Sequence, residues 1–99
     1  MSEAVERFLQ KRVILFTVPW HPDVRAIVDF FNSLPSRPRG KMVELVHVDA
    51  YESPDAAASE GVSTFPSLIV RGKLGERLIH LPTDTEKCTR EILRVINLL

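Results

Sequence analysis

The chain has 99 residues, of which 44% are hydrophobic and 26% are charged. This length supplies enough apolar side chains for one hydrophobic core, so we expect a single domain over residues 1–99. Thirteen basic residues balance thirteen acidic residues, and the composition therefore gives no electrostatic reason to expect nucleic acid or an anionic membrane as a partner. No apolar run approaches the roughly 20 residues that span a bilayer. With no apolar signal core at the start of the chain, the sequence predicts an intracellular, cytoplasmic protein.

The first predicted elements are a helix, a strand and a second helix. Residues Ser2 to Gln10 carry apolar side chains at helical spacing, which predicts a short N-terminal helix. Arg12 to Val18 is apolar without alternation at its centre, which is typical of a strand that is buried on both faces. A tight turn follows, and apolar residues then recur at three-and-four spacing up to Leu34.

The start of this second helix has the residues of a helix N-terminus. Pro22 suits the first helical position because its missing N–H is not needed there. Asp23 would then stand in the first turn, where the helix dipole favours a negative charge. This register places His21 at the N-cap.

In the second half of the chain the sequence predicts a strand, a short helix and a hairpin. Val43 to Asp49 is a strand candidate, and Ser53 to Gly61 has a cap, a proline and a terminal glycine around a short helix. Leu68 to Val70 and Leu78 to Leu81 are strand candidates, and the glycine-containing loop Arg71 to Gly75 between them favours an antiparallel hairpin.

The last predicted helix begins at a capping box that Thr83 and Glu86 would form. Its inward stripe consists of Cys88, Ile92, Val95, Ile96 and Leu99. Cys88 is the only cysteine of the chain, so an internal disulfide is excluded, and on this stripe we expect it to act as a small buried hydrophobe.

Two segments of the chain resemble motifs of the thioredoxin and glutaredoxin families. Phe16 to Val24 resembles the thioredoxin strand that ends in Trp-Cys-x-x-Cys and the glutaredoxin segment Thr-x-Pro-x-Cys-Pro-x-Cys. Val62 to Leu68 is similar to the segment around the cis-proline of these families, just before the third strand. The resemblance covers about residues 11 to 99. It implies an α/β, thioredoxin-like fold, in which a βαβ unit and an antiparallel hairpin form a central mixed four-stranded sheet flanked by helices, with the short helix at the N-terminus in addition.

The thiol chemistry of these families does not follow from the resemblance, because the two cysteine positions hold His21 and Val24. The Cys-x-x-Cys motif is replaced by His21-Pro22-Asp23-Val24, and neither imidazole nor an isopropyl group forms a disulfide. Thioredoxins also have a buried acid and a nearby lysine, and the aligned positions hold Leu15 and Leu45. We therefore expect no enzyme, no catalytic residue and no cofactor.

His21 has two interpretations. It is either an acid, base or ligand, or a polar residue of the turn, and we favour the turn residue. The three histidines do not have the spacing that places two imidazoles on one metal, so no metal site is expected. An enzyme that uses His21 as a base lacks a nucleophile and an orienting partner, and ranks last.

The candidate partner-binding groove consists of Trp20, His21, Pro22, Phe65 and Pro66. An aromatic side chain beside a rigid proline suits contact with a protein segment. The alternative is that Trp20 and Phe65 merely cover each other.

These residues lead to two functional hypotheses. The first is a redox-inactive protein-binding module that acts as an adaptor or as a structural subunit of a larger complex, with protein partners and without nucleic acid or membrane binding. The second is a domain that binds glutathione or a small anionic peptide through backbone N–H groups and a helix N-terminus. For the second, the only basic candidates near the groove are Arg25 and Lys87.

Overall fold

The computed structural model describes residues 11–35, 43–73 and 75–99. In this part of the chain the elements are β1 (Lys11–Thr17), α2 (Val24–Ser33), β2 (Val43–Asp49), α3 (Pro54–Ser59), β3 (Ser67–Gly72), β4 (Gly75–His80) and α4 (Thr85–Asn97). This succession confirms the order that was predicted for these residues. The helix expected over Ser2 to Gln10 and the basic run Arg37 to Lys41 lie outside the described residues.

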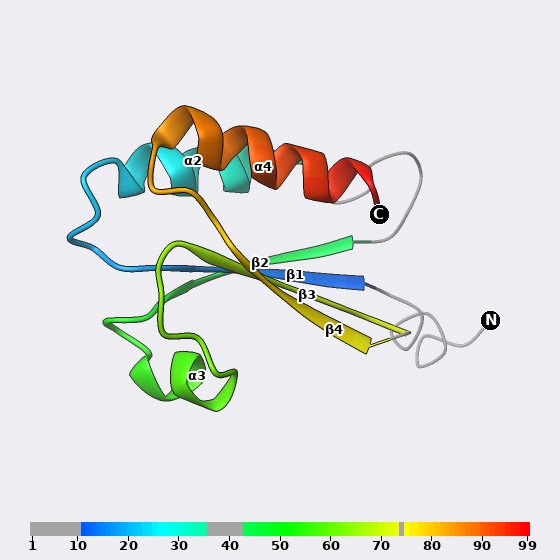
Figure 1. The fold of residues 1–99 in the computed structure, drawn as a ribbon, viewed down its shortest axis with the longest axis horizontal. Coiled ribbons are helices and arrows are strands. Elements are labelled where there is room, and N and C mark those ends of the chain that lie inside the picture. The colour runs from blue at the N-terminus through cyan, green and yellow to red at the C-terminus, as the bar shows by residue number, and fades with distance from the viewer. Residues whose placement is uncertain (1–10, 36–42, 74) are drawn as a thin grey trace.

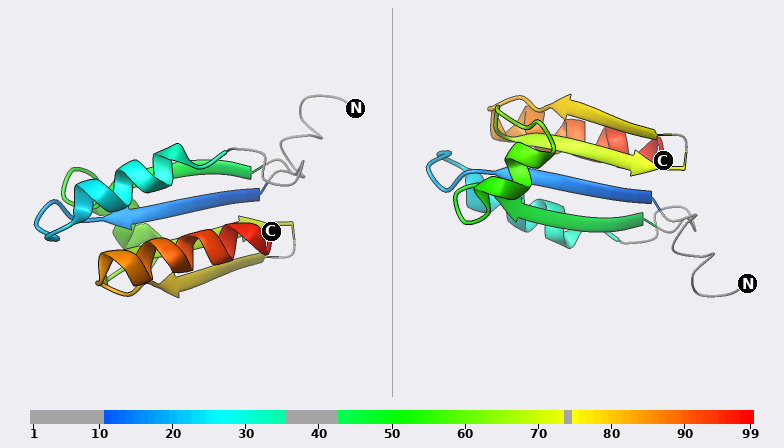
Figure 2. Two further views of the ribbon diagram at one scale, coloured as in Figure 1. Left: turned by 90° about the horizontal axis from the view of Figure 1, so that it is seen from above. Right: turned by 90° about the horizontal axis from the view of Figure 1, so that it is seen from below.

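The four strands form one mixed sheet in the order β2-β1-β3-β4. β1 and β2 are parallel, and the pairs β1–β3 and β3–β4 are antiparallel. The sheet separates two helical layers, because α2 and α4 lie on one face and α3 lies on the other (Figures 1 and 2). The α/β class and the combination of a βαβ unit with a hairpin are therefore confirmed.

β1 runs through the middle of the hydrophobic core, which explains its unbroken apolar run. Val13 and Leu15 belong to the cluster that α2 and α4 cover, whereas Ile14 and Phe16 belong to the cluster that α3 covers. All four side chains are buried. Successive strand residues point to opposite faces, and both faces are covered, so every position in the strand centre is apolar.

The hairpin is tighter than the sequence suggested. The predicted loop Arg71 to Gly75 is wrong in its extent, because the ladder continues until Gly72 pairs with Gly75. Arg71 and Glu76 face each other in this extension, and the Nε atom of Arg71 lies 2.8 Å from a carboxylate oxygen of Glu76. Gly75 has a φ of 127°, a conformation that favours glycine.

The helix starts were predicted with mixed success. α3 begins at Pro54 and is followed by Gly61 at a φ of 72°, as the sequence indicated. For α4 the prediction of a Thr83 cap is wrong, because the N-cap is Asp84, whose carboxylate accepts the Lys87 N–H at 3.0 Å. Asp84 is the better acceptor for this position because its charge also interacts favourably with the helix dipole.

The start of α2 also differs from the prediction. The helix begins at Val24 with Asp23 as its N-cap, so His21 is not the N-cap and Pro22 is not the first helical residue. The Asp23 side chain makes no capping hydrogen bond to the helix. The physical reason is that the side chains of His21 and Asp23 bond elsewhere, as described below.

Within the described residues, no helix combines the length and the apolar character that crossing a membrane requires.

Candidate functional site

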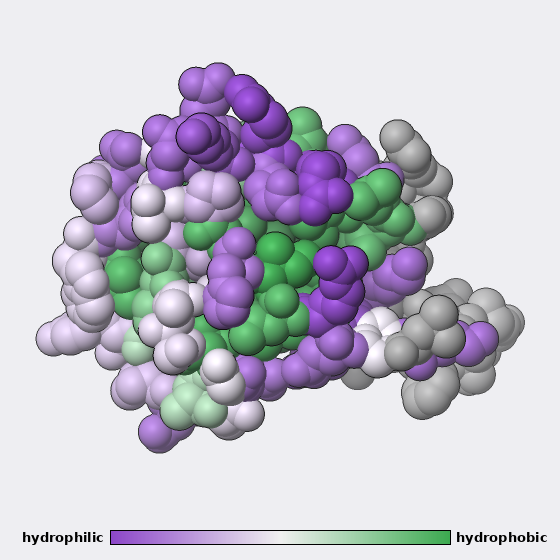
Figure 3. Space-filling model, in the orientation of Figure 1, coloured by the Kyte–Doolittle hydropathy of each residue, from purple (hydrophilic) through white to green (hydrophobic). Residues whose placement is uncertain are grey.

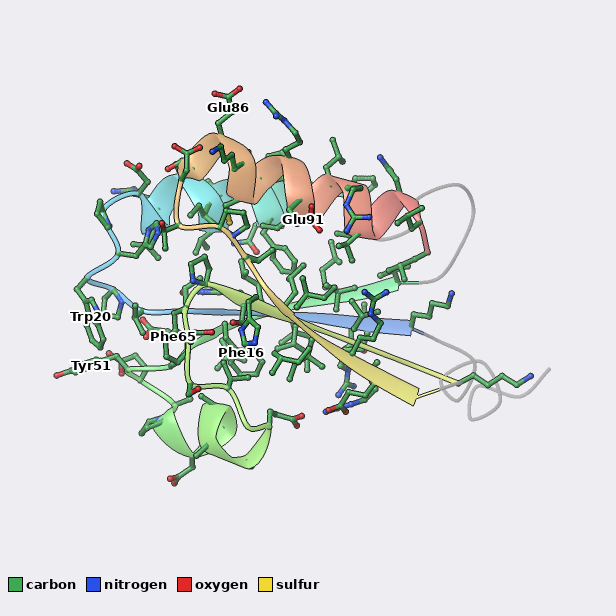
Figure 4. All side chains as sticks on the ribbon, in the orientation of Figure 1. Phe16, Trp20, Tyr51, Phe65, Glu86 and Glu91 are labelled. Carbon is green, nitrogen blue, oxygen red and sulfur yellow. The ribbon has the colours of Figure 1, made fainter. Side chains whose placement is uncertain are left out.

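The candidate site lies at the edge of the sheet where the parallel strands β1 and β2 both end. The turn after β1 and the turn after β2 are neighbours there, and the Ala50 N–H donates to the Thr17 carbonyl at 2.8 Å. The loop before β3 reaches the same edge, because Phe16 is paired with Ser67 across β1 and β3. The fold thus brings Trp20, in the first turn, near Phe65, in the loop before β3 (Figure 4).

Two large aromatic side chains are exposed to solvent at this edge. Trp20 is 69% exposed and Tyr51 is 65% exposed. Their ring centroids are 6.1 Å apart and their planes are at 86°, which is an edge-to-face contact (Figure 4). The end of the molecule that carries them has mostly side chains of intermediate hydropathy, whereas the α4 layer is strongly hydrophilic (Figure 3).

Phe65 and Trp20 do not cover each other. It is half-buried and packs against the core cluster on the α3 side of the sheet. In the view of Figure 4 it lies between the aromatic pair and Phe16. Trp20 therefore keeps most of its surface open, and the ring that it contacts is that of Tyr51.

Tyr51 was missed by sequence reasoning. It follows β2 by two residues, and its position is fixed by Asp49, whose Oδ1 atom accepts the N–H groups of Tyr51 at 2.8 Å and of Glu52 at 3.3 Å. The signal that could have found it is topological. The carboxyl ends of two neighbouring parallel strands meet at one edge, so the residues after β2 had to lie beside those after β1.

His21 uses both ring nitrogens within the protein. Nδ1 accepts the Asp23 N–H at 3.3 Å, and Nε2 lies 3.0 Å from the Thr83 carbonyl oxygen. The neutral tautomer with its proton on Nε2 satisfies both contacts, and we assign it on that ground. His21 thus acts as a polar residue of the turn that also reaches the start of α4.

A second contact joins the same turn to α4. The Thr85 hydroxyl donates to the Asp23 carboxylate at 2.5 Å. Together with the contact between His21 and Thr83, this hydrogen bond connects residues that are 62 positions apart in the sequence. The turn between β1 and α2 is therefore bound at two points to the start of α4, at Thr83 just before its N-cap and at Thr85, its first residue.

The loop before β3 carries two of the residues predicted for the groove, Phe65 and Pro66. The peptide bond between Phe65 and Pro66 is cis, and the Pro66 carbonyl accepts the Leu81 N–H at 3.1 Å. The hydroxyl of the buried Ser67 donates to the Thr64 carbonyl at 2.6 Å, and the Thr64 hydroxyl lies 2.7 Å from Nδ1 of His80. Side-chain hydrogen bonds on both sides of Pro66 thus fix the loop.

The positions that the resemblance aligns with the cysteines and proton-transfer residues of thioredoxins hold apolar side chains or the hydrogen-bonded His21. Leu15 is fully buried, and Leu45 is half-buried against the same core cluster. Val24 is half-buried at the first turn of α2. These side chains supply neither an acid nor a base for proton transfer.

Cys88 lies in the core between the sheet and the helical layer of α2 and α4. Its exposed surface is 0%, and burial raises the pKa of its thiol to about 11. Its neighbours in the core cluster include Ile27 and Ile92. Reactive cysteines have a low pKa and access to solvent, and Cys88 has neither.

His47 is a second histidine near this edge whose ring contacts another side chain of the protein. Its Nε2 atom lies 2.7 Å from the hydroxyl of the buried Thr17, across β1 and β2. Burial lowers the pKa of His47, and the negative charge of Asp49 opposes this shift. In the described ranges, no three His, Cys, Asp or Glu side chains come together as a set that could hold a metal ion.

Comparison with known proteins shows similarity in structure. No protein-family model matches the chain, and no curated protein matches it. Among solved structures, a thioredoxin mutant from Entamoeba histolytica superposes with a TM-score of 0.71 at 17% identity, over 97% of this chain and 88% of that one. Mitochondrial thioredoxin 3 from Saccharomyces cerevisiae gives 0.66 at 23% identity, over 97% and 85%. The Trx4 domain of ERdj5 gives 0.60 at 22% identity, over 92% and 83%.

Proposed function

We propose that this chain, which has the thioredoxin-like fold without the cysteine pair, is a redox-inactive protein-binding module that works as an adaptor or as a structural subunit of a complex. The observation that carries this proposal is the set of residues in and beside the turn after β1. His21 and Val24 occupy the cysteine positions, while the exposed aromatic pair Trp20 and Tyr51 stands beside them.

The placement of the single thiol supports the redox part of the proposal. Thiol–disulfide exchange requires attack by a thiolate on an accessible disulfide. Cys88 is fully buried in α4 and its pKa is raised to about 11, so its thiolate is rare and enclosed. No second cysteine exists to resolve a mixed disulfide.

The geometry of the edge supports the binding part. A tryptophan that exposes 69% of its surface contributes little to the core, yet the backbone that carries it is held by His21 and Asp23. A fixed turn presents an aromatic side chain at low entropic cost to a partner. Aromatic anchors of this kind are enriched among the residues that dominate protein interfaces.

The second hypothesis, a glutathione or anionic peptide site, receives less support from the charges. Such a ligand needs basic side chains or free N–H groups at a helix start. Arg25 and Lys87 are the nearest basic residues in sequence, and both are exposed on helices beyond the turns. The Asp23 N–H, at the start of α2, already donates to His21.

A disulfide reduction assay tests the redox part. The purified chain should give no turnover of insulin or hydroxyethyl disulfide above the buffer rate, and Cys88→Ser should leave the result unchanged. Thiol-dependent turnover that disappears in Cys88→Ser would overturn this part of the proposal.

Affinity capture with mass spectrometry tests the binding part. Trp20→Ala and Phe65→Ala should each reduce the partners that copurify with the chain, whereas Leu98→Ala should not. Leu98 is a matched control because it is 70% exposed and lies at the end of α4 that is remote from the aromatic pair. Unchanged capture by both aromatic variants, with native circular dichroism, would exclude this edge as the interface.

A further inference from the structure

We propose that the segment recognised at this edge is basic, and that a lysine or arginine side chain of the partner protein seats against Trp20 and Tyr51. The inference rests on the proposed function and adds the chemistry of the partner. It is carried by the distribution of charge around the aromatic pair. The net charge of the whole chain is zero and does not reveal this local distribution.

Acidic residues outnumber basic residues at this edge. Three segments meet there, residues 18–24, 49–55 and 81–85, and they contain five acidic residues and no lysine or arginine, while the nearest basic residues, Arg25 and Lys87, follow on the helices α2 and α4. Their carboxylates belong to Asp23, Asp49, Glu52, Asp55 and Asp84. The contacts already described, from Thr17 to Ala50 and from Asp23 to Thr85, hold the three segments together.

These carboxylates are not neutralised by cations among the described residues. Glutamates elsewhere in the described ranges are paired with arginines, namely Glu44 with Arg12, Glu60 and Glu76 with Arg71, Glu86 with Arg90, and Glu91 with Arg94. The acids of the edge instead accept hydrogen bonds from neutral donors, as Asp49 does from two backbone N–H groups and Asp23 does from a hydroxyl. Neutral donors hold the carboxylates in place without cancelling their charge.

The aromatic pair supplies the contact surface for a cation. Trp20 and Tyr51 stand at 86° to each other, so their exposed faces look in different directions and form a corner. The face of an aromatic ring attracts an ammonium or guanidinium group, and tryptophan does so most strongly. Glu52 follows Tyr51 directly and is exposed, so a carboxylate is near the corner to pair with the same cation.

Other partner chemistries fit this edge less well. A nucleic acid, an anionic lipid or an acidic peptide would bring negative charge against the five carboxylates. A purely apolar segment would use the rings but leave the charges without a role. Of the classes of ligand, a basic segment of a protein is the one that uses both features.

A titration followed by NMR tests the inference directly. The probe is the peptide acetyl-Gly-Arg-Gly-Arg-Gly-Arg-Gly-amide, added to the isotope-labelled full chain. Its control is the same peptide with citrulline in place of each arginine, which keeps the shape and removes the charge. The arginine peptide should shift the Trp20 indole N–H and the backbone amides of residues 49–53, and the shifts should weaken as salt is raised from 20 to 300 mM.

Substitutions locate the site. Trp20→Ala should weaken the arginine peptide about fivefold, the size of an exposed cation–π contact. Glu52→Gln should weaken it about threefold, while Glu76→Gln should have no effect because Glu76 lies in the hairpin and is already paired with Arg71. Equal binding of the citrulline peptide, or shifts that centre away from residues 18–24 and 49–55, would overturn the inference.

The peptide titration and the capture experiment can fail independently, so they test the chemistry of the partner and the proposed function separately. If Trp20→Ala abolishes capture of the natural partners but the arginine peptide does not bind, the edge is an interface and its partner is not basic. If Trp20→Ala leaves capture unchanged and the peptide still binds at residues 49–53, the edge recognises cations without being the interface of the natural complex.

Discussion

Unfolding the chain should increase the rate at which Cys88 reacts with an aromatic disulfide reagent by more than a hundredfold. At pH 8 a thiol with its pKa at about 11 is a thiolate in roughly one molecule in 1,000. An ordinary cysteine, with a pKa near 8.5, is a thiolate in about one molecule in four at that pH. The change in ionisation alone therefore predicts a factor of about 250 between the native and the denatured chain.

The burial of Cys88 adds a second barrier, because a side chain with 0% exposed surface must become accessible before the reagent reaches it. If the reaction requires an opening that costs at least about 5 kcal/mol, a typical lower bound for global stability, the thiol ionises normally in the open state and the opening alone gives a factor of roughly 5,000. The rate is measured by absorbance, with and without denaturant. A native rate within tenfold of the denatured rate would refute the assignment of Cys88 as an enclosed, inert thiol.

A pair of neighbouring substitutions separates the two barriers. Ile92→Ala removes a fully buried side chain from the same cluster and should cost about 2–4 kcal/mol. If opening limits the reaction, this variant should react roughly 30- to 900-fold faster than the native chain. Leu93→Ala is the control, because Leu93 is 41% exposed and its truncation should change the rate much less.

Two further predictions concern the contacts that hold this edge. Burial lowers the pKa of His47 in the fold, so the unfolded chain takes up this proton first, and stability should fall as pH drops below about 6.5. His47→Gln, which keeps a polar partner for Thr17, should reduce this slope in urea unfolding between pH 7.5 and 5; an unchanged slope would show that other groups cause it. Thr85→Val removes the hydroxyl that donates to Asp23 and should cost about 1 kcal/mol, with faster exchange of the backbone amides of Trp20, His21, Asp23 and Val24. Thr85→Ser should retain the protection, and equal exchange in both variants would contradict this role.

Much of the fold follows from local patterns in the sequence. The strand predicted over Val43 to Asp49 is the observed β2, and the unbroken apolar run of β1 correctly indicated helices on both faces. The stripe of α4 was predicted because three-and-four spacing depends only on the helix itself. Its buried members are Cys88, Ile92, Val95 and Ile96.

The two errors at the candidate site arise where a side chain contacts a distant part of the chain. Pro22 and Asp23 have the local features of a helix start, yet the Asp23 carboxylate is engaged by Thr85, 62 residues away. That contact exists only after α4 packs beside α2, so no window of sequence contains it. Tyr51 was missed for the same reason, because its contact with Trp20 depends on the parallel pairing of β1 and β2.

The turn after β1 holds His21 where thioredoxins have a cysteine, and this side chain makes two contacts within the protein. An imidazole at position 21 reaches the Thr83 carbonyl with one nitrogen and the Asp23 N–H with the other, a span that the shorter side chain of cysteine does not offer. The residue in the cysteine position is thus committed to holding the turn against α4. This contact holds the backbone next to Trp20, whose indole is 69% exposed. His21 therefore stands where thioredoxins have a cysteine and also holds the turn that carries the surface on which we place the partner.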